Sequence, residues 1–333
     1  MVVGVYTDMT MTTDLLTQAR AGSNDAFEAL TQPHHRELLV HCYRMLGSFH
    51  DAEDTLQDTL LSAWQGLSGF EERASLRTWL YRIATHRCLN VLRSARRRPQ
   101  EWNVPGIEAP EPTQLGEVAW LEPFPDALMD GLYVPPGPEA RYELNESVSL
   151  AFITAVQALP PRQVAALMLR DVLGFSAKET AAMLDSSVES ANSALKRARA
   201  TLRGQSFTDE PTPTRAQEAL VSRFVQAYEA ADLPALVALL TDKVFMAMPP
   251  ISYEYVGSAA VAGFLSNLFV SGPRFELVPT RANGQPAFGL YVRKNGVRIG
   301  TGLLVITLSG GKVSAMLRFE KELLPKFGLE PTL

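Results

Sequence analysis

The sequence predicts a multidomain fold in which two all-α modules are followed by an α+β domain shaped as a cone-like barrel. In both modules apolar residues recur at three- and four-residue steps, the spacing of one helix face. Beyond residue 215, runs of β-branched and aromatic residues alternate with Gly-containing turns, which is typical of strands. The expected boundaries are residues 12–98 for the first module, 99–138 for a linker, 139–204 for the second module, 205–214 for another linker and 215–333 for the α+β domain.

Composition places the chain among globular proteins. Hydrophobic residues make up 46% of its 333 residues, and no run approaches the ~18 consecutive apolar residues of a membrane span. The N-terminus has no basic segment followed by an apolar core, so we expect no signal peptide and no membrane contact. The two cysteines, Cys42 and Cys88, fall on predicted buried helix faces, which indicates a reduced, cytoplasmic protein.

Four histidines cluster near Cys42 and raise the question of a metal site. They are His34, His35, His41 and His50. The cluster lacks the paired spacing of a structural zinc site, so we expect packing and surface roles, with neither a metal nor another cofactor.

The first module is predicted to contain a short helix at residues 14–21 and a longer one, capped by residues 23–25, that runs to about Leu46. Gly47 and Ser48 end it. A third helix spans residues 51–64, with acids in its first turn, where the helix dipole favours them. Its expected apolar stripe consists of Leu56, Leu60, Leu61 and Trp64. The acids form either an anionic face for a basic partner or a solvated face.

Residues 70–98 combine a loop with one helix, for which Ser75 is the expected cap. The helix buries one apolar face, and its other face lacks acids. That face, with its flanks, carries Arg77, Tyr81, Arg82, Thr85, His86, Asn90, Arg93, Arg96 and Arg97. Cations interleaved with aromatics hold a nucleic-acid backbone and stack on bases. The alternative is a solvated amphipathic helix with an Arg-rich end.

The linker is acidic and rich in proline. Eight acids and no Lys or Arg lie between Glu101 and Glu139, so the net charge of −5 is unevenly spread. Such a segment cannot bury enough apolar surface to fold alone. Its large apolar residues indicate that it docks on a surface instead of staying free in solution; they are Trp102, Trp120, Leu121 and Phe124.

The second module ends in a helix-turn-helix pattern at residues 173–199. Ser176 and Glu179 form a capping box, a short helix ends at Leu184, and a second helix begins near Val188. The second helix of this motif enters the major groove. Its candidate DNA contacts, with the cap, are Ser176, Ser190, Asn192, Ser193, Lys196, Arg197 and Arg199. An ordinary helical hairpin is the alternative, because this pattern gives many false positives.

The α+β domain is expected to place three helices before four antiparallel strands. The strands span residues 274–281, 288–293, 297–308 and 312–319, with hairpin turns at 295–296 and 309–311. A curved sheet with leading helices forms a cone whose interior is a common ligand site. The candidate pocket residues are Phe245, Met248, Tyr253, Tyr291 and Arg318, for most of which core packing is the alternative.

The two helical modules together resemble an extracytoplasmic-function (ECF, group 4) sigma-70 factor. Residues 51–58 are similar to region 2.2, residues 76–84 to regions 2.3–2.4, and residues 159–163 with the helix-turn-helix to region 4. The resemblance implies a partner, core RNA polymerase, bound through its β′ clamp coiled coil and β flap, and promoter DNA. The implied polymerase contacts are Glu53, Asp54, Gln57, Asp58 and Trp64.

By the same resemblance, the first module opens the −10 element and region 4 reads the −35 element. The implied −10 residues are Phe70, Arg73, Arg77, Trp79, Arg82, His86, Asn90, Arg93, Arg96 and Arg97. The acidic linker would thread the polymerase cleft that RNA otherwise occupies. Asn192 and Ala194 stand where many relatives carry Arg, so the −35 preference is expected to be unusual. The linker is also longer than is typical of the family.

The last domain resembles a SnoaL-like domain of the NTF2 fold, which a subset of these sigma factors uses to regulate the sigma domains through intramolecular contact. Relatives with this fold include enzymes, but all histidines here lie at or before His86, so we expect no catalysis. An unidentified small ligand is a further candidate partner. Two other functions stay open: a one-component helix-turn-helix regulator with a sensor domain, and a SnoaL-type enzyme with a helical arm.

Overall fold

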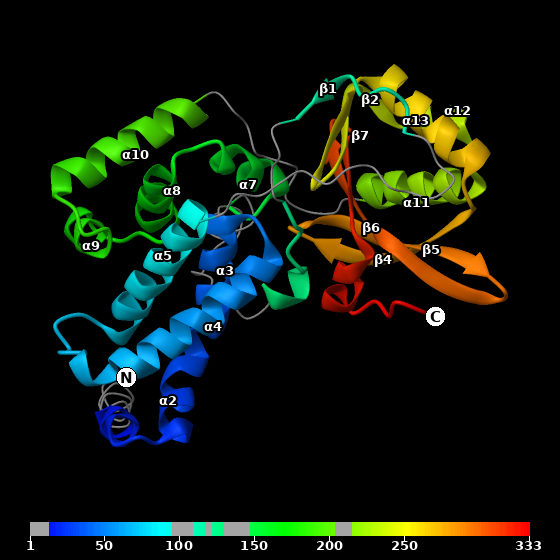
Figure 1. The fold of residues 1–333 in the computed structure, drawn as a ribbon. Coiled ribbons are helices and arrows are strands. Elements are labelled where there is room, and N and C mark those ends of the chain that lie inside the picture. Colours follow the sequence, from blue (N-terminus) through cyan, green and yellow to red (C-terminus); the bar gives the residue numbers. More distant parts are fainter. Residues whose placement is uncertain (1–12, 95–108, 117–120, 130–146, 204–214) are drawn as a thin grey trace. The chain divides into compact units, whose positions relative to one another are not determined.

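The computed structural model describes residues 13–94, 109–116, 121–129, 147–203 and 215–333 (Figure 1). The described chain forms two compact units. The first contains the helices up to residue 94 together with residues 155–203, and the second contains residues 109–116, 121–129, 147–154 and 215–333. No helix among the described residues has the length and apolar character needed to cross a membrane.

The first unit is all-helical. After a helix at residues 13–20, its elements are α2 (Asn24–Thr31), η1 (Gln32–His34), α3 (His35–Leu46), α4 (Phe49–Gly66), η2 (Leu67–Gly69), α5 (Leu76–Ser94), α8 (Pro161–Leu167), the π-helical turn η4 (Met168–Val172), α9 (Ala177–Met183) and α10 (Val188–Leu202). α7 (Leu150–Gln157) precedes α8. The continuous helix expected up to Leu46 is wrong, because Pro33 lacks an N–H and disfavours helix at the preceding residue, so a 3-10 turn separates α2 from α3.

α4 buries a different stripe from the predicted one. Its core side is made by small residues, including Ala52, Thr59 and Ala63, whereas Leu61 is 56% exposed. The prediction that Leu61 belongs to the apolar stripe is therefore wrong. The buried residues of α4 lie about one sequence position away from the predicted Leu-rich stripe. Their small side chains let α4 pack closely against neighbouring helices.

The second unit is built on one curved sheet. Its helices are α11 (Arg215–Ala230), α12 (Leu233–Ala238) and α13 (Ser258–Ser271), with η3 (Asp126–Leu128) and η5 (Lys321–Phe327). Its strands are β1 (Gln114–Leu115), β2 (Leu240–Met248), β3 (Ile251–Val256), β4 (Phe275–Ala282), β5 (Gln285–Lys294), β6 (Val297–Ser309) and β7 (Lys312–Phe319). The order is β1-β3-β2-β7-β6-β5-β4, and only the β2–β7 pair is parallel among these described strands. β1, β2 and β3 were not predicted.

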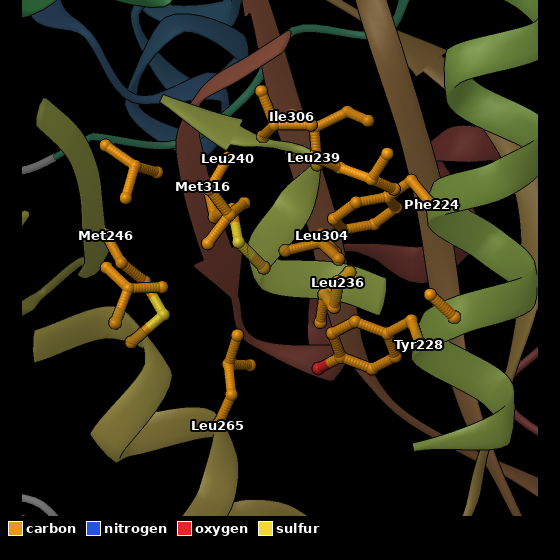
Figure 2. Packing of buried hydrophobic residues seen from close by; sticks show 14 of the residues in the cluster. Phe224, Tyr228, Leu236, Leu239, Leu240, Met246, Leu265, Leu304, Ile306 and Met316 are labelled. Atoms are coloured by element: carbon orange, nitrogen blue, oxygen red, sulfur yellow. The ribbon is translucent and has the colours of Figure 1, made fainter. Parts of the chain in front are cut away.

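The concave side of the sheet is filled by side chains (Figure 2). Phe224 and Tyr228 from α11, Leu236 from α12 and Leu265 from α13 pack against Leu304 and other strand residues in one buried cluster. Of the predicted pocket residues, Met248 and Tyr253 belong to this packing, and Arg318 pairs in register with Leu304.

Two predicted pocket residues, Phe245 and Tyr291, lie outside this cluster. Phe245 alternates along β2 with Val244 and Met246, which both lie in the cluster. Since side chains of a strand alternate between faces, Phe245 lies on the other face. Tyr291 also lies outside the cluster, and its hydroxyl donates to the Glu330 carbonyl oxygen at 2.6 Å.

The expected docking of the linker is confirmed for its described residues. Thr113 donates through its N–H and its hydroxyl to the Glu254 carbonyl oxygen, at 3.0 and 2.9 Å, and β1 then extends the sheet beside β3. Leu121 and Phe124 are buried. Trp102 and Trp120 lie outside the described residues.

Asn283 fixes the linker to the tip of the β4–β5 hairpin. Its side-chain oxygen accepts from the Phe124 N–H at 2.7 Å, and its amide donates to the Val148 carbonyl oxygen at 2.6 Å. Next to it, Asp126 accepts from Arg281 and from the Gly284 N–H. Asn283 is 2% exposed, so these bonds replace water contacts that its backbone partners have lost.

Candidate nucleic-acid interface

α5 positions its polar face by burying the opposite one. Leu80, Ala84 and Cys88 are fully buried, and Ser75 accepts from the Thr78 N–H at 3.1 Å, which confirms the predicted cap. Arg82, His86, Asn90 and Arg93 recur at three- and four-residue steps; His86 is half-buried and the others are exposed. They therefore share one solvent-facing stripe. Arg96 and Arg97 lie outside the described residues.

A pocket of about 420 Å³ lies at the start of α5. We call residues 70–75 the capture loop. The pocket is lined by the capture-loop residues Phe70, Glu72, Arg73, Ala74 and Ser75, by Leu76, and by Thr13, Leu16 and Leu30. Its volume is within the range of small-molecule sites, roughly 300–1,000 Å³.

Phe70 and Trp79 give the pocket a rigid base. Their ring centroids are 4.9 Å apart at 31°, and both pack in a cluster with Leu16, Leu30 and Leu67. Phe70 is only 7% exposed. The Arg73 side chain, in contrast, is 84% exposed and forms an ion pair with Glu71.

Glu72 in the capture loop has a left-handed backbone, with φ of 57°. That conformation costs a residue other than glycine roughly 1–2 kcal/mol. It persists only where neighbouring contacts determine it.

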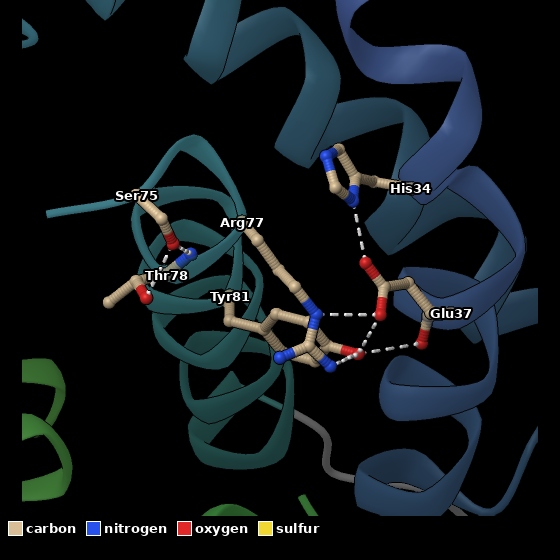
Figure 3. A network of polar contacts seen from close by, with 6 residues as sticks. All are labelled: His34, Glu37, Ser75, Arg77, Thr78 and Tyr81. Atoms are coloured by element: carbon tan, nitrogen blue, oxygen red, sulfur yellow. Dashed lines mark hydrogen bonds and ion pairs between the residues drawn. The ribbon is translucent and has the colours of Figure 1, made fainter. Parts of the chain in front are cut away.

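Arg77 points away from the exposed stripe, into a polar network between α3 and α5 (Figure 3). Its Nε donates to Glu37 Oε2 at 2.9 Å, and Glu37 also contacts His34 Nδ1 at 2.6 Å and accepts from the Tyr81 hydroxyl at 3.2 Å. Although burial raises the pKa of Glu37, hydrogen bonds from His34 and Arg77 hold it below its ordinary value. Arg77 therefore joins two helices, and we do not propose it as a DNA contact.

Two side chains of the stripe on α5 contact an acid of the helix-turn-helix. Arg82 Nη2 lies 2.8 Å from Asp185 Oδ1, and His86 Nε2 lies 3.3 Å from Asp185 Oδ2. Asp185 occupies the turn after α9 with φ of 44°. The Arg82 and Asp185 side chains are each more than half exposed, so this pairing contributes only about 0–1 kcal/mol and weakens with salt.

The helix-turn-helix forms as predicted. Ser176 and Glu179 make the capping box of α9, and Ser187 caps α10. The exposed face of α10 contains Ser190, Asn192, Ser193, Lys196 and Arg197, whereas Ala194 is buried.

Arg199 and Ser176 have internal partners. Arg199 forms a two-pronged ion pair with Asp171 at 2.8 and 2.6 Å, and the Ser176 hydroxyl accepts from the Glu179 N–H at 3.2 Å. Both side chains therefore stabilise the helix-turn-helix through contacts inside it.

The acidic surface of α4 includes Leu61, which the helical spacing had predicted to be buried. Asp54, Gln57 and Asp58 are exposed, whereas Glu53 and Trp64 are half-buried, and the Trp64 ring packs against Phe27 at 5.1 Å. The exposed Leu61 lies one turn beyond Gln57 and Asp58.

No group of three or more His, Cys, Asp or Glu side chains within the described ranges could hold a metal ion. His41 and Cys42 are fully buried, and Cys42 and Cys88 are unpaired thiols. Burial raises the pKa of the Cys88 thiol, which makes it unreactive.

Comparisons with known proteins agree with this arrangement. Three family models match: Sigma-70 region 2 over residues 30–98, Sigma-70 region 4 over residues 149–202 and a SnoaL-like domain over residues 221–316. The chain is similar to the ECF RNA polymerase sigma factor SigG of Mycobacterium tuberculosis, with 41% identity over 319 residues that span 92% of this chain and 85% of the relative. SigM of the same species is 30% identical over 57% of this chain and 81% of its own length.

A solved structure shows the same fold. The crystal structure of the M. tuberculosis ECF sigma factor SigJ superposes with a TM-score of 0.57 and 22% identity, covering 90% of this chain and 96% of that one. The predicted fold class, two helical sigma domains followed by an NTF2-like α+β domain, is confirmed.

The buried imidazole of His41 provides a pH-dependent test of how α3 holds α5. Its Nε2 lies 2.9 Å from Thr85 Oγ1, and burial, with the nearby charges of Arg44 and Arg77, lowers the pKa of His41 from 6.5 to about 3. Between these values the unfolded chain binds a proton that the folded chain does not, so stability falls as pH falls. We expect His41 to account for about 1.4 kcal/mol of lost unfolding free energy between pH 7.5 and 5.5.

His41→Gln keeps a polar partner for Thr85 and should remove that part of the pH dependence. Denaturant unfolding of the full chain at both pH values measures the difference. Identical pH dependence in wild type and variant would show that His41 titrates normally in the folded state.

Proposed function

The chain belongs to the ECF family of RNA polymerase sigma factors, and from that premise we propose which of its surfaces bind polymerase, open DNA and restrain the protein. Sigma factors bind core RNA polymerase and promoter DNA, and they are non-catalytic initiation factors. The observation that carries the proposal is the pocket of about 420 Å³ at the start of the cationic stripe of α5.

The pocket is proposed to receive one unpaired base of the non-template strand at the −10 element. Extracting a base from the duplex costs a few kcal/mol, which a fitted pocket and stacking contacts repay. The capture loop lines much of this pocket, and Trp79 packs against Phe70. Arg82, His86, Asn90 and Arg93 continue from it along one face, where their cations hold phosphates and so position the strand without reading its sequence.

We assign polymerase binding to the exposed face of α4. Asp54 and Asp58 present two exposed acids, with Gln57 beside them and Leu61 one turn further on, which suits a basic coiled coil such as the β′ clamp of the polymerase. α10 is proposed to read the −35 element through Ser190, Asn192, Ser193 and Lys196, while region 4 contacts the β flap. Asparagine pairs with adenine by two hydrogen bonds, so we expect Asn192 to favour adenine.

The second unit is proposed to restrain the linker. Residues 113–115 extend its sheet, and the Asn283 side chain binds the linker backbone at Phe124 and the backbone of the second module at Val148. A linker held in this way cannot also thread the RNA path of the polymerase. We therefore propose that the second unit inhibits initiation until the linker is released.

Reconstitution with core polymerase tests the function as a whole. The full chain should direct transcription from a promoter selected in vitro with the holoenzyme, and should bind that duplex poorly without core. Asp58→Lys should weaken core binding by at least about tenfold, or 1.4 kcal/mol, whereas Asp242→Lys, on an exposed position of β2, should not. Tight duplex binding by the free chain with no core binding would instead indicate a one-component regulator.

Base capture predicts that Trp79→Ala impairs strand opening more than duplex binding. Losing the ring that supports Phe70 should lower permanganate reactivity of unpaired thymines by roughly tenfold, with gel-shift affinity for the duplex changed less than about twofold. An equal loss in both measurements would contradict the assignment.

Release of the linker can be tested with two asparagines in matched turns. Asn283→Ala removes the side-chain bonds to Phe124 and Val148 and keeps the backbone bond from the Asn283 N–H to the Phe124 carbonyl oxygen. It should accelerate amide exchange of residues 121–129 by roughly 30-fold, or about 2 kcal/mol, and raise transcription at limiting core. Asn295→Ala is the control, since Asn295 has a similar φ of 52° but is exposed. Faster exchange without added transcription would contradict inhibition by linker retention.

A further inference from the structure

The pocket is completed by a helix that lies outside the matched sigma regions. The Sigma-70 region 2 model begins at residue 30, yet Thr13 and Leu16 of the helix at residues 13–20 line the pocket. Leu16 and Ala19 are buried in the cluster that contains Phe70. This N-terminal helix is therefore packed against the capture loop and forms one side of the site.

Arg20, at the end of that helix, contacts the capture loop at two points. Its Nη1 donates to Glu72 Oε1 at 3.0 Å, and its Nη2 donates to the Phe70 carbonyl oxygen. A guanidinium presents several donors in a fixed plane, so two bonds from one group set both the distance and the orientation of their acceptors. Arg20 does not line the pocket.

The capture loop needs such an external support. Residues 71–75 are all exposed, so burial holds only its first residue, Phe70. Glu72 has the left-handed backbone described above, and its carboxylate is the group that Arg20 binds. The two bonds thus hold the loop at its buried start and at its strained residue.

We propose that Arg20 is a positioning residue that keeps the capture loop in the shape that receives the flipped base. The inference rests on the proposed role of this loop. Arg20 acts through Glu72 and Phe70 and does not bind DNA itself. Because a misplacement of about 1 Å in a binding group can cost as much as a hundredfold, losing the support should slow opening without altering duplex affinity.

The first measurement is independent of DNA. In the free full-length chain, Arg20→Ala should raise amide exchange at residues 70–75 by about tenfold, while helical circular dichroism stays unchanged. Arg20→Lys keeps the charge but loses the planar pair of donors, and should give an intermediate rate. Arg223→Ala, which removes an exposed Arg of α11, should have no effect. Unchanged exchange in Arg20→Ala would overturn the proposal.

The second measurement uses the holoenzyme on a promoter selected from duplexes randomised at both elements. Arg20→Ala should reduce permanganate-detected opening by roughly tenfold on duplex DNA. The double variant Arg20→Ala with Glu72→Ala should open the duplex no less than the more impaired single variant does, since the two residues act as one unit. The salt dependence of duplex binding should be unchanged. A shallower salt slope would show that Arg20 contacts phosphates directly and would overturn the proposal.

Arg73→Ala separates this inference from the proposed function. Arg73 lines the pocket and is exposed, so the variant should fold. If Arg73→Ala reduces opening and Arg20→Ala does not, the positioning role of Arg20 is wrong, while the proposed role of the capture loop in base capture is kept. If neither reduces opening although exchange rises in Arg20→Ala, the loop has no part in base capture and the proposal falls with it.

Discussion

The contact between α3 and α5 is the constraint on which the proposed DNA-binding surface depends. α5 can present a stripe of cations only because its other side is fixed in rotation against α3. Three kinds of contact fix it: the buried Cys42 and Cys88 side chains, the bond between His41 and Thr85, and the ion pair of Glu37 with Arg77. Since a helix repeats every 3.6 residues, these contacts also decide that Arg82, His86 and Asn90 face outward.

Sequence patterns located the elements whose partners are close along the chain. The helix of α5, the capping box of Ser176 with Glu179 and the Asn295-Gly296 turn follow from local spacing and local hydrogen bonds, and all are present. The stripe of α5 was also found, because one-sided cations at helical spacing are a local signal.

The remaining parts of the site depend on contacts between distant residues. Arg20 and Glu72 are 52 positions apart, and Phe124 and Asn283 are 159 apart, and no periodicity connects such pairs. Leu61 was misplaced for a related reason: its exposure depends on how closely the small residues of α4 let a neighbour approach. Arg77 looked like a DNA contact because its charge is visible in the sequence, whereas its partner Glu37 lies on another helix.

The intramolecular contacts of this chain differ in how easily DNA can replace them. Asp185 holds Arg82 and His86 at a largely exposed site, where salt screens the attraction and a phosphate backbone offers the same cations a denser array of charge. The bonds of Asn283 to the linker are buried and uncharged, so neither salt nor DNA competes for them. Only a partner that binds the linker itself can supply the free energy that is lost when these bonds break. We therefore expect DNA to displace the first restraint and polymerase to displace the second.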